Sequence, residues 1–333
     1  MALEALSLQN NRIHWVDSAK GLGVILIIVG HLAYSSSISW IVHLIYSFHI
    51  PLFFMLAGTT YKRPSNRIIS FLRGKNKRLL IPFLCYTLIG LPFEYEELKG
   101  ESLKTIIYGM FYIKSEIIYN LPLWFLVVLF LVYCIAAISR ADNDNTICTS
   151  IYALFAFVVG WLFYVINDDV SVFNILGINR VIICFAFFII GKTIARINPS
   201  VPLAVISGIL CIGIALMNEK VSVYSYELGS YWLFVISGLS GSIAIIQLTK
   251  LLFDKPILLG YFSKYGILFL GTQYLWIMPF RNLCKEFCIE KVFPTYDVVA
   301  LVLMLIYVLA TPLIYNLLSK KAKVLRVLNG EYS

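Results

Sequence analysis

The feature that most constrains the fold is a succession of about ten apolar runs, each close to twenty residues long. A helix needs about 20 apolar residues to cross about 30 Å of hydrocarbon, and only helices and closed barrels satisfy their backbone hydrogen bonds in lipid. The sequence therefore predicts an all-α, polytopic bundle of about ten transmembrane helices. The runs lie near residues 19–38, 39–60, 79–96, 121–139, 146–166, 178–196, 201–217, 230–249, 257–279 and 296–318.

Composition and domain organisation agree with a chain surrounded by membrane lipid. Hydrophobic residues make up 60% of the chain and charged residues 14%, against about 45–50% apolar and 25% charged residues in soluble domains. We expect one transmembrane domain over residues 12–320, between a short tail at 1–11 and a basic tail at 321–333. Residues 1–18 are too polar for a cleavable signal peptide, so the first run is expected to be retained.

The distribution of Lys and Arg predicts the orientation. With a cytoplasmic N-terminus, 18 basic residues fall on the cytoplasmic side, 8 fall on the outer side, and Lys264 lies inside a predicted span. Basic residues are enriched in cytoplasmic loops of membrane proteins, so both termini are expected in the cytoplasm. Topology thus explains the net charge of +9, and a nucleic-acid partner is not expected.

The four histidines all lie in the first fifty residues. Ionisable side chains are costly inside a membrane, and they usually face a protein interior or a water-filled cavity where they serve a function. His31 lies deep in the first run, and His49 lies beside Pro51, where a distorted helix can open a cavity. A simple hydrogen bond between helices is the alternative for either one. His14 and His43 are interpreted as interfacial residues.

Lys20 and His31 are separated by eleven residues. At 100° per residue, their side chains lie about 20° apart around a helix and about 16 Å apart along it. Asp17 precedes Lys20 by three residues and shares the same stripe, where it can pair with Lys20. The pattern suits a long donor that enters from the cytoplasm with its anionic groups near Lys20 and its reactive end near His31. Alternatively, Lys20 extends to the lipid headgroups.

The segment Arg73-Gly-Lys-Asn-Lys-Arg78 has two interpretations of equal weight. It is either a positive anchor at the cytoplasmic surface or a phosphate site, because Lys and Arg bind phosphate oxygens strongly. The longest outer segment, 94–120, combines acidic and aromatic residues and is either a surface that meets an acceptor or a solvated connection. No Cys or His spacing typical of zinc sites occurs, so no metal is expected.

These motifs together resemble the membrane acyltransferase 3 family, bacterial O-acyltransferases that modify cell-surface glycans. A basic residue, ten intervening residues and a histidine, as in Lys20 to His31, are similar to the family's first span. Lys75-Asn-Lys-Arg78 followed by Leu79-Leu-Ile-Pro82 is similar to its basic motif before the third span. Phe48-His-Ile-Pro-Leu-Phe-Phe54 and Leu123-Trp-Phe-Leu126 also resemble family segments. In many members a serine-containing segment of a late span ends in histidine. Gly266 and Gln273 occupy those places here, and a neutral amide does not titrate.

The resemblance implies transfer of an acyl group, in the simplest case acetyl from cytoplasmic acetyl-CoA, to a hydroxyl of a cell-surface polysaccharide or lipid-linked sugar at a bacterial inner membrane. It implies His31 as the general base, and direct transfer and an acyl-imidazole intermediate both stay open. A transporter or flippase for a sugar or lipid intermediate is the alternative, and a non-catalytic scaffold is a third hypothesis. The other expected site residues are Lys20, Asp17 and His49 near His31, and Arg73, Lys75 and Arg78 on the CoA phosphates.

Overall fold

A computed structural model describes residues 13–32, 39–64, 67–94, 100, 121–139, 145–166, 177–253, 258–287 and 295–332. Each of the ten predicted runs is helical within these ranges, which confirms the all-α class. The helices are α2 (His14–Leu32), α3 (Ser39–Thr59), α4 (Ile68–Gly90), α7 (Trp124–Ser139), α8 (Thr146–Val165), α10 (Ile178–Ala195), α11 (Val201–Met217), α12 (Tyr231–Leu252), α13 (Leu258–Lys264), α14 (Gly266–Glu286) and α15 (Thr295–Lys321). Short 3-10 helices are η2 (Leu91–Glu94), η3 (Leu121–Leu123) and η5 (Lys323–Asn329).

Seven of the described helices are long and apolar enough to cross a membrane: α2, α3, α7 with η3, α8, α10, α12 and α15. The remaining predicted spans fall on α11, which is shorter, and on α4, α13 and α14, where polar residues or a break interrupt the apolar run. The outward faces of α8, α11 and α15 expose many Leu, Ile and Val side chains. Several apolar spans with lipid-facing surfaces identify a multi-pass membrane protein.

Two predicted boundaries differ from the structure. The run at 257–279 is not one helix, because Tyr265 separates α13 from α14. This break leaves Lys264 exposed at the end of α13, rather than inside a continuous apolar span where its charge would be costly. The run at 79–96 belongs to a helix that begins earlier, at Ile68, and continues through the basic segment.

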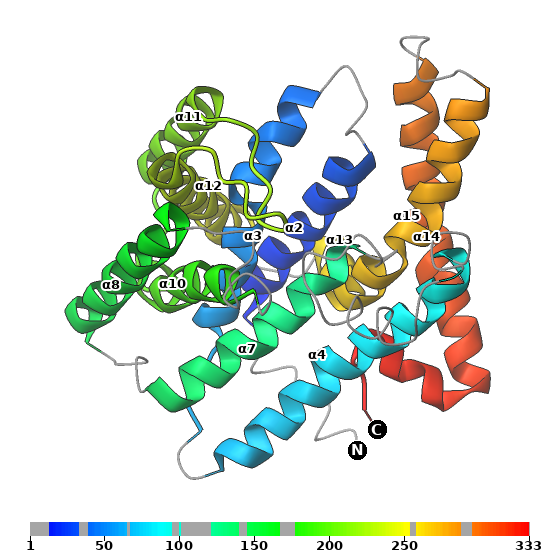
Figure 1. Ribbon diagram of the computed structural model, residues 1–333, viewed down its shortest axis with the longest axis horizontal. Coiled ribbons are helices and arrows are strands. Elements are labelled where there is room, and N and C mark those ends of the chain that lie inside the picture. The colour runs from blue at the N-terminus through cyan, green and yellow to red at the C-terminus, as the bar shows by residue number, and fades with distance from the viewer. Residues whose placement is uncertain are drawn as a thin grey trace.

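Helix α2 lies at the centre of the bundle (Figure 1), where it packs against α3, α12, α13, α14 and α15. Helices α8, α10, α11 and α12 gather on one side of it, and α14 and α15 lie on the other. Small residues allow the closest approaches, as in many membrane helix pairs. A Cβ atom at Gly21 would collide with the carbonyl of Leu259, and one at Gly58 would collide with the carbonyl of Phe188.

Candidate active site

A cavity of about 520 Å³ runs along α2 from Lys20 to His31. On α2, the residues that line it recur at helical spacing: Lys20, Val24, Ile27 and His31. This confirms the geometric prediction that the lysine and the histidine share one face of the first helix, about 16 Å apart by helix rise. Helices α3, α7 and α14, together with the loop between α11 and α12, supply most of the other walls.

The Asp17 carboxylate stands at the Lys20 end, where its Oδ1 accepts a hydrogen bond from the Ser263 hydroxyl at 3.4 Å. Ser263 is at the end of α13 and lines the cavity. Asp17 thus contacts α13, and its charge also acts on Lys20, the partner that the spacing predicted. Asp17 connects the first helix to the adjacent α13, whose Ser263 lines the cavity.

The basic segment of α4 divides into buried and exposed members. Lys75 is half-buried, and its Nζ lies 3.7 Å from the centre of the Tyr133 ring, which lines the cavity. Lys75 precedes the apolar part of α4. The pKa of its ammonium is lowered to about 8, mainly by burial and to a smaller extent by the positive charges of Arg78 and Lys20. Arg73 and Arg78 are exposed and do not line the cavity. Only Lys75 thus reaches the edge of the candidate site.

At the other end, groups from three helices hold His31 and the end of α2. Its Nδ1 lies 3.2 Å from the hydroxyl oxygen of Tyr46 on α3 and 3.4 Å from that of Tyr274 on α14. Its carbonyl accepts a hydrogen bond from Nη2 of Arg281 at 2.7 Å, and the next carbonyl, of Leu32, accepts one from the Tyr296 hydroxyl of α15 at 3.0 Å. These bonds satisfy carbonyls that the end of a helix leaves open, and the arginine charge suits the negative end of the helix dipole.

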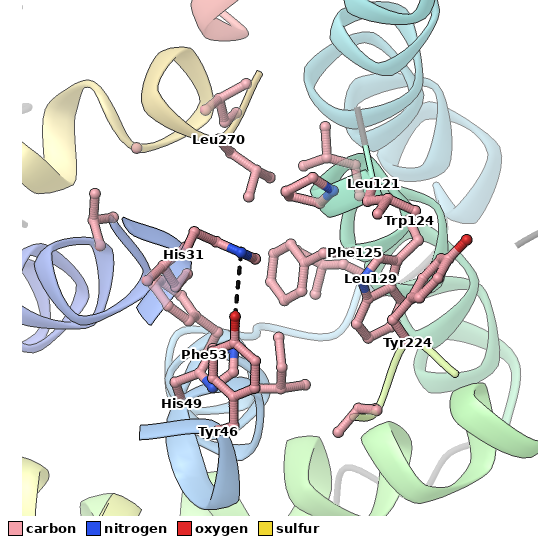
Figure 2. Close-up of a pocket in the computed structure, with 18 of the residues that line it drawn as sticks. His31, Tyr46, His49, Phe53, Leu121, Trp124, Phe125, Leu129, Tyr224 and Leu270 are labelled. Atoms are coloured by element: carbon pink, nitrogen blue, oxygen red, sulfur yellow. Dashed lines mark hydrogen bonds between the residues drawn. The ribbon is translucent and has the colours of Figure 1, made fainter. Parts of the chain in front are cut away.

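The second histidine of the site, His49, is buried and lines the same cavity. Its Nδ1 lies 2.9 Å from the carbonyl oxygen of Ile45, so Nδ1 carries the proton and donates it. The Tyr46 ring lies between the two histidines, with its centre 5.1 Å from that of His49 and 6.0 Å from that of His31 (Figure 2). His49 therefore stands behind Tyr46, and the polar residues of α2 and α3 meet in one place as the sequence predicted.

The other two histidines and Gln273 lie off the cavity wall. His43 Nε2 lies 2.6 Å from the Ala215 carbonyl and joins α3 to α11, which is a structural role. Gln273 is buried, and its Nε2 donates to the Leu270 carbonyl at 3.3 Å. The neighbouring Tyr274 faces the cavity instead.

Apart from Glu94 and Gly100, the segment 94–120 lies outside the described residues.

Aromatic side chains form the wall across from His31. Figure 2 shows Phe125, Trp124 and Tyr224 on the side of the cavity opposite the imidazole. Trp124 and Phe125 begin α7, whereas Tyr224 belongs to the loop between α11 and α12. No sequence pattern points to Tyr224, Tyr274 or Arg281. Tyr274 and Arg281 are seven residues apart on one face of α14, but the chain has 21 tyrosines, so this spacing alone is not distinctive.

The arrangement of His31 fits a general base. When Nδ1 carries the proton it donates to a tyrosine oxygen, and Nε2 is then an unprotonated acceptor. No described residue hydrogen-bonds Nε2, which is open to the cavity. In that tautomer the imidazole has the free nitrogen that proton abstraction from a bound hydroxyl requires. Within the described ranges, no three His, Cys, Asp or Glu side chains come together as metal ligands.

Comparison with known proteins supplies one match. A family model described as "Acyltransferase domain" matches residues 13–317. That range includes every described residue of the cavity wall. Neither a comparison with curated proteins nor one with solved structures finds a match.

Proposed function

Because the chain belongs to the membrane acyltransferase 3 family, we propose that this membrane acyltransferase moves an acetyl group from cytoplasmic acetyl-CoA to a hydroxyl of a cell-surface polysaccharide or lipid-linked sugar. The observation that carries the proposal is the cavity between Lys20 and His31. It links a cation near one end of α2 to an imidazole with an open nitrogen near the other end. The membrane is a bacterial inner membrane.

The charge distribution supports a donor that enters at the Lys20 end. With both termini cytoplasmic, 18 basic residues lie on the cytoplasmic side against 8 outside, and Lys20 then lies near the cytoplasmic surface. At this end Lys20 lines the cavity and Lys75 lies at its edge beside Tyr133, while Arg73 and Arg78 are exposed on α4. Phosphates of CoA bind these side chains, and the extended arm of CoA carries the thioester toward His31.

The acceptor hydroxyl reacts at His31. Nε2 takes the hydroxyl proton as the oxygen attacks the thioester carbonyl carbon, and the imidazolium is stabilised by the tyrosine oxygen on Nδ1. The carbon–sulfur bond then breaks, a carbon–oxygen ester bond remains, and the proton passes to the CoA thiolate to give the free thiol. Arg281, which lines the cavity beside His31, is assigned to stabilise the negative charge that develops on the carbonyl oxygen. His49 supports the imidazole through Tyr46.

The test is acetyl transfer by the purified protein in lipid nanodiscs, with labelled acetyl-CoA and de-O-acetylated oligosaccharides released from the surface of producing cells. The wild-type protein should transfer label, and His31→Gln should lower kcat by about 10²–10⁴-fold, the range of general base catalysis. His43→Gln is the matched control, because His43 is a histidine of the neighbouring helix α3 that bonds Ala215 outside the cavity.

Two results would overturn the proposal. One is an absence of both thioester hydrolysis and transfer, together with surface glycans of unchanged mass when the gene is removed. The other is uptake of the oligosaccharides by proteoliposomes without acetylation, which would favour a transporter.

A further inference from the structure

We propose that Trp124, Phe125 and Tyr224 form the acceptor subsite, a binding surface for the ring of the sugar that carries the reacting hydroxyl. This inference rests on the proposed function and names residues for its second substrate. The three side chains line the cavity opposite His31 (Figure 2). A sugar bound against them lies between the aromatic wall and the imidazole.

The three rings form an open corner rather than a closed stack. The centres of the Trp124 and Tyr224 rings are 6.4 Å apart with planes at 51°, and those of Trp124 and Phe125 are 6.5 Å apart at 85°. Phe125 also packs edge-on against Phe53 and Phe54. The rings are therefore held from behind, while part of their surface stays available to the cavity.

The loop that carries Tyr224 is anchored by a costly buried charge. Arg180 is fully buried, and its Nε donates to the Tyr224 carbonyl at 2.7 Å. The guanidinium also bonds Asn179 Oδ1 at 3.2 Å and lies 5.8 Å from the centre of the Tyr226 ring. Burying an arginine requires compensating hydrogen bonds. Here the compensation fixes the backbone of a residue in the cavity wall.

The base of the same loop is fixed by Asn218. Its Nδ2 donates to the Leu228 carbonyl at 3.0 Å, and its Oδ1 accepts from the Ser230 amide at 2.8 Å. The Tyr164 hydroxyl donates to the Gly229 carbonyl at 2.6 Å. The loop between α11 and α12 is thus a rigid wall, and a rigid surface loses little entropy when a ligand binds.

The chemistry of this wall favours a sugar ring over an acyl chain. One face of a pyranose presents C–H groups, which pack on the electron-rich faces of Trp, Tyr and Phe, while its hydroxyls lie at the edge. Those hydroxyls would point toward the polar wall of His31, Tyr274 and Arg281. The subsite faces His31, which is about 16 Å from Lys20 along α2, so the sugar and the phosphates of the donor occupy different ends of the cavity.

The kinetic test uses Trp124→Leu and Tyr224→Leu with the oligosaccharide pool as acceptor. Each variant should raise the KM for the acceptor about 3- to 10-fold, the scale of one aromatic contact, without changing the KM for acetyl-CoA or the slow hydrolysis of its thioester. The matched control is Trp161→Leu, because Trp161 and Trp232 form a pair with the same 6.4 Å separation that does not line the cavity. An unchanged acceptor KM with a raised KM for decanoyl-CoA would identify the wall as an acyl pocket and overturn the proposal.

A second test does not depend on catalysis. The same oligosaccharides, tagged with a diazirine, should crosslink on illumination to peptides that contain Trp124 or Tyr224, and untagged oligosaccharides should compete. Labelling confined to other peptides would contradict the subsite even if acetyl transfer is observed. Labelling of these peptides in a protein that transfers no acetyl group would refute the proposed function and leave the subsite standing.

Discussion

The two ends of the cavity differ in the groups that line them. At the Lys20 end, the polar groups are charges or a hydroxyl on separate helices: Lys20, Ser263 and, beside Tyr133, Lys75. At the His31 end, an imidazole is surrounded by tyrosine hydroxyls and Arg281, with an aromatic wall opposite. A cation attracts a phosphate from several ångströms away, whereas proton transfer requires heavy atoms about 2.6–3.2 Å apart.

This difference suggests a division of labour between binding and chemistry. If the proposed function is right, substitutions at the Lys20 end should change the KM for acetyl-CoA, and substitutions at the His31 end should change kcat, because the proposal places only the latter against the reacting atoms. Each prediction that follows separates these two parameters.

Lys20→Met should give the largest effect at the donor end. Loss of a charge-assisted bond to phosphate costs about 1.5–3 kcal/mol, so the KM for acetyl-CoA should rise about 10- to 100-fold with kcat nearly unchanged. Steady-state kinetics in nanodiscs measures both values. Lys264→Met is the control, because Lys264 is exposed beside the cavity and does not line it. A fall in kcat at constant KM would show that Lys20 takes part in the chemical step, like the residues of the His31 end.

The lowered pKa of Lys75 predicts that the kcat/KM for acetyl-CoA depends on pH. Its pKa of about 8 means that it is protonated below that pH and loses its charge as the pH rises through it. The kcat/KM for acetyl-CoA should therefore fall, by up to about 10-fold between pH 7 and pH 9. Lys75→Arg should remove this dependence, since arginine stays charged, and the exposed Arg73→Lys should retain it. A wild-type profile identical to that of Lys75→Arg would exclude Lys75 from donor binding.

The sequence predicted the first wall of the cavity because that wall lies on one helix. Lys20 and His31 share a face through helical periodicity alone, and both line the cavity. Apolar runs likewise located the helices. They did not reveal the break at Tyr265, because the surrounding run is apolar on both sides and Lys264 was its one signal.

Tertiary contacts supplied what local patterns could not. Arg281 counted among the outer basic residues in sequence, but it bonds the carbonyl of His31, 250 residues away along the chain. In the basic segment of α4, hydropathy could not distinguish the half-buried Lys75 from the exposed Arg73 and Arg78. Which charge of a cluster turns inward depends on the neighbouring helix, here on Tyr133 of α7.

The smallest expected effects come from substitutions of the two tyrosines at the His31 end. Tyr46→Phe or Tyr274→Phe removes one neutral hydrogen bond to His31 Nδ1, worth about 0.5–1.5 kcal/mol, so each should lower kcat about 2- to 10-fold with the KM for acetyl-CoA unchanged. Both hydroxyls reach the same nitrogen, and either one orients the ring when the other is absent. The double variant should therefore lose more than the product of the single effects.

A matched control for the tyrosines is Tyr261→Phe, whose hydroxyl bonds the Val308 carbonyl away from the cavity. It should leave kcat unchanged. The fold-decrease in kcat of the double variant could instead equal the product of the two single decreases. The tyrosines would then act independently, and packing rather than the Nδ1 hydrogen bonds would hold the ring of His31. The orientation of the base would then come from the Arg281 bond and the end of α2, and the comparison of the two ends would rest on the arginine alone.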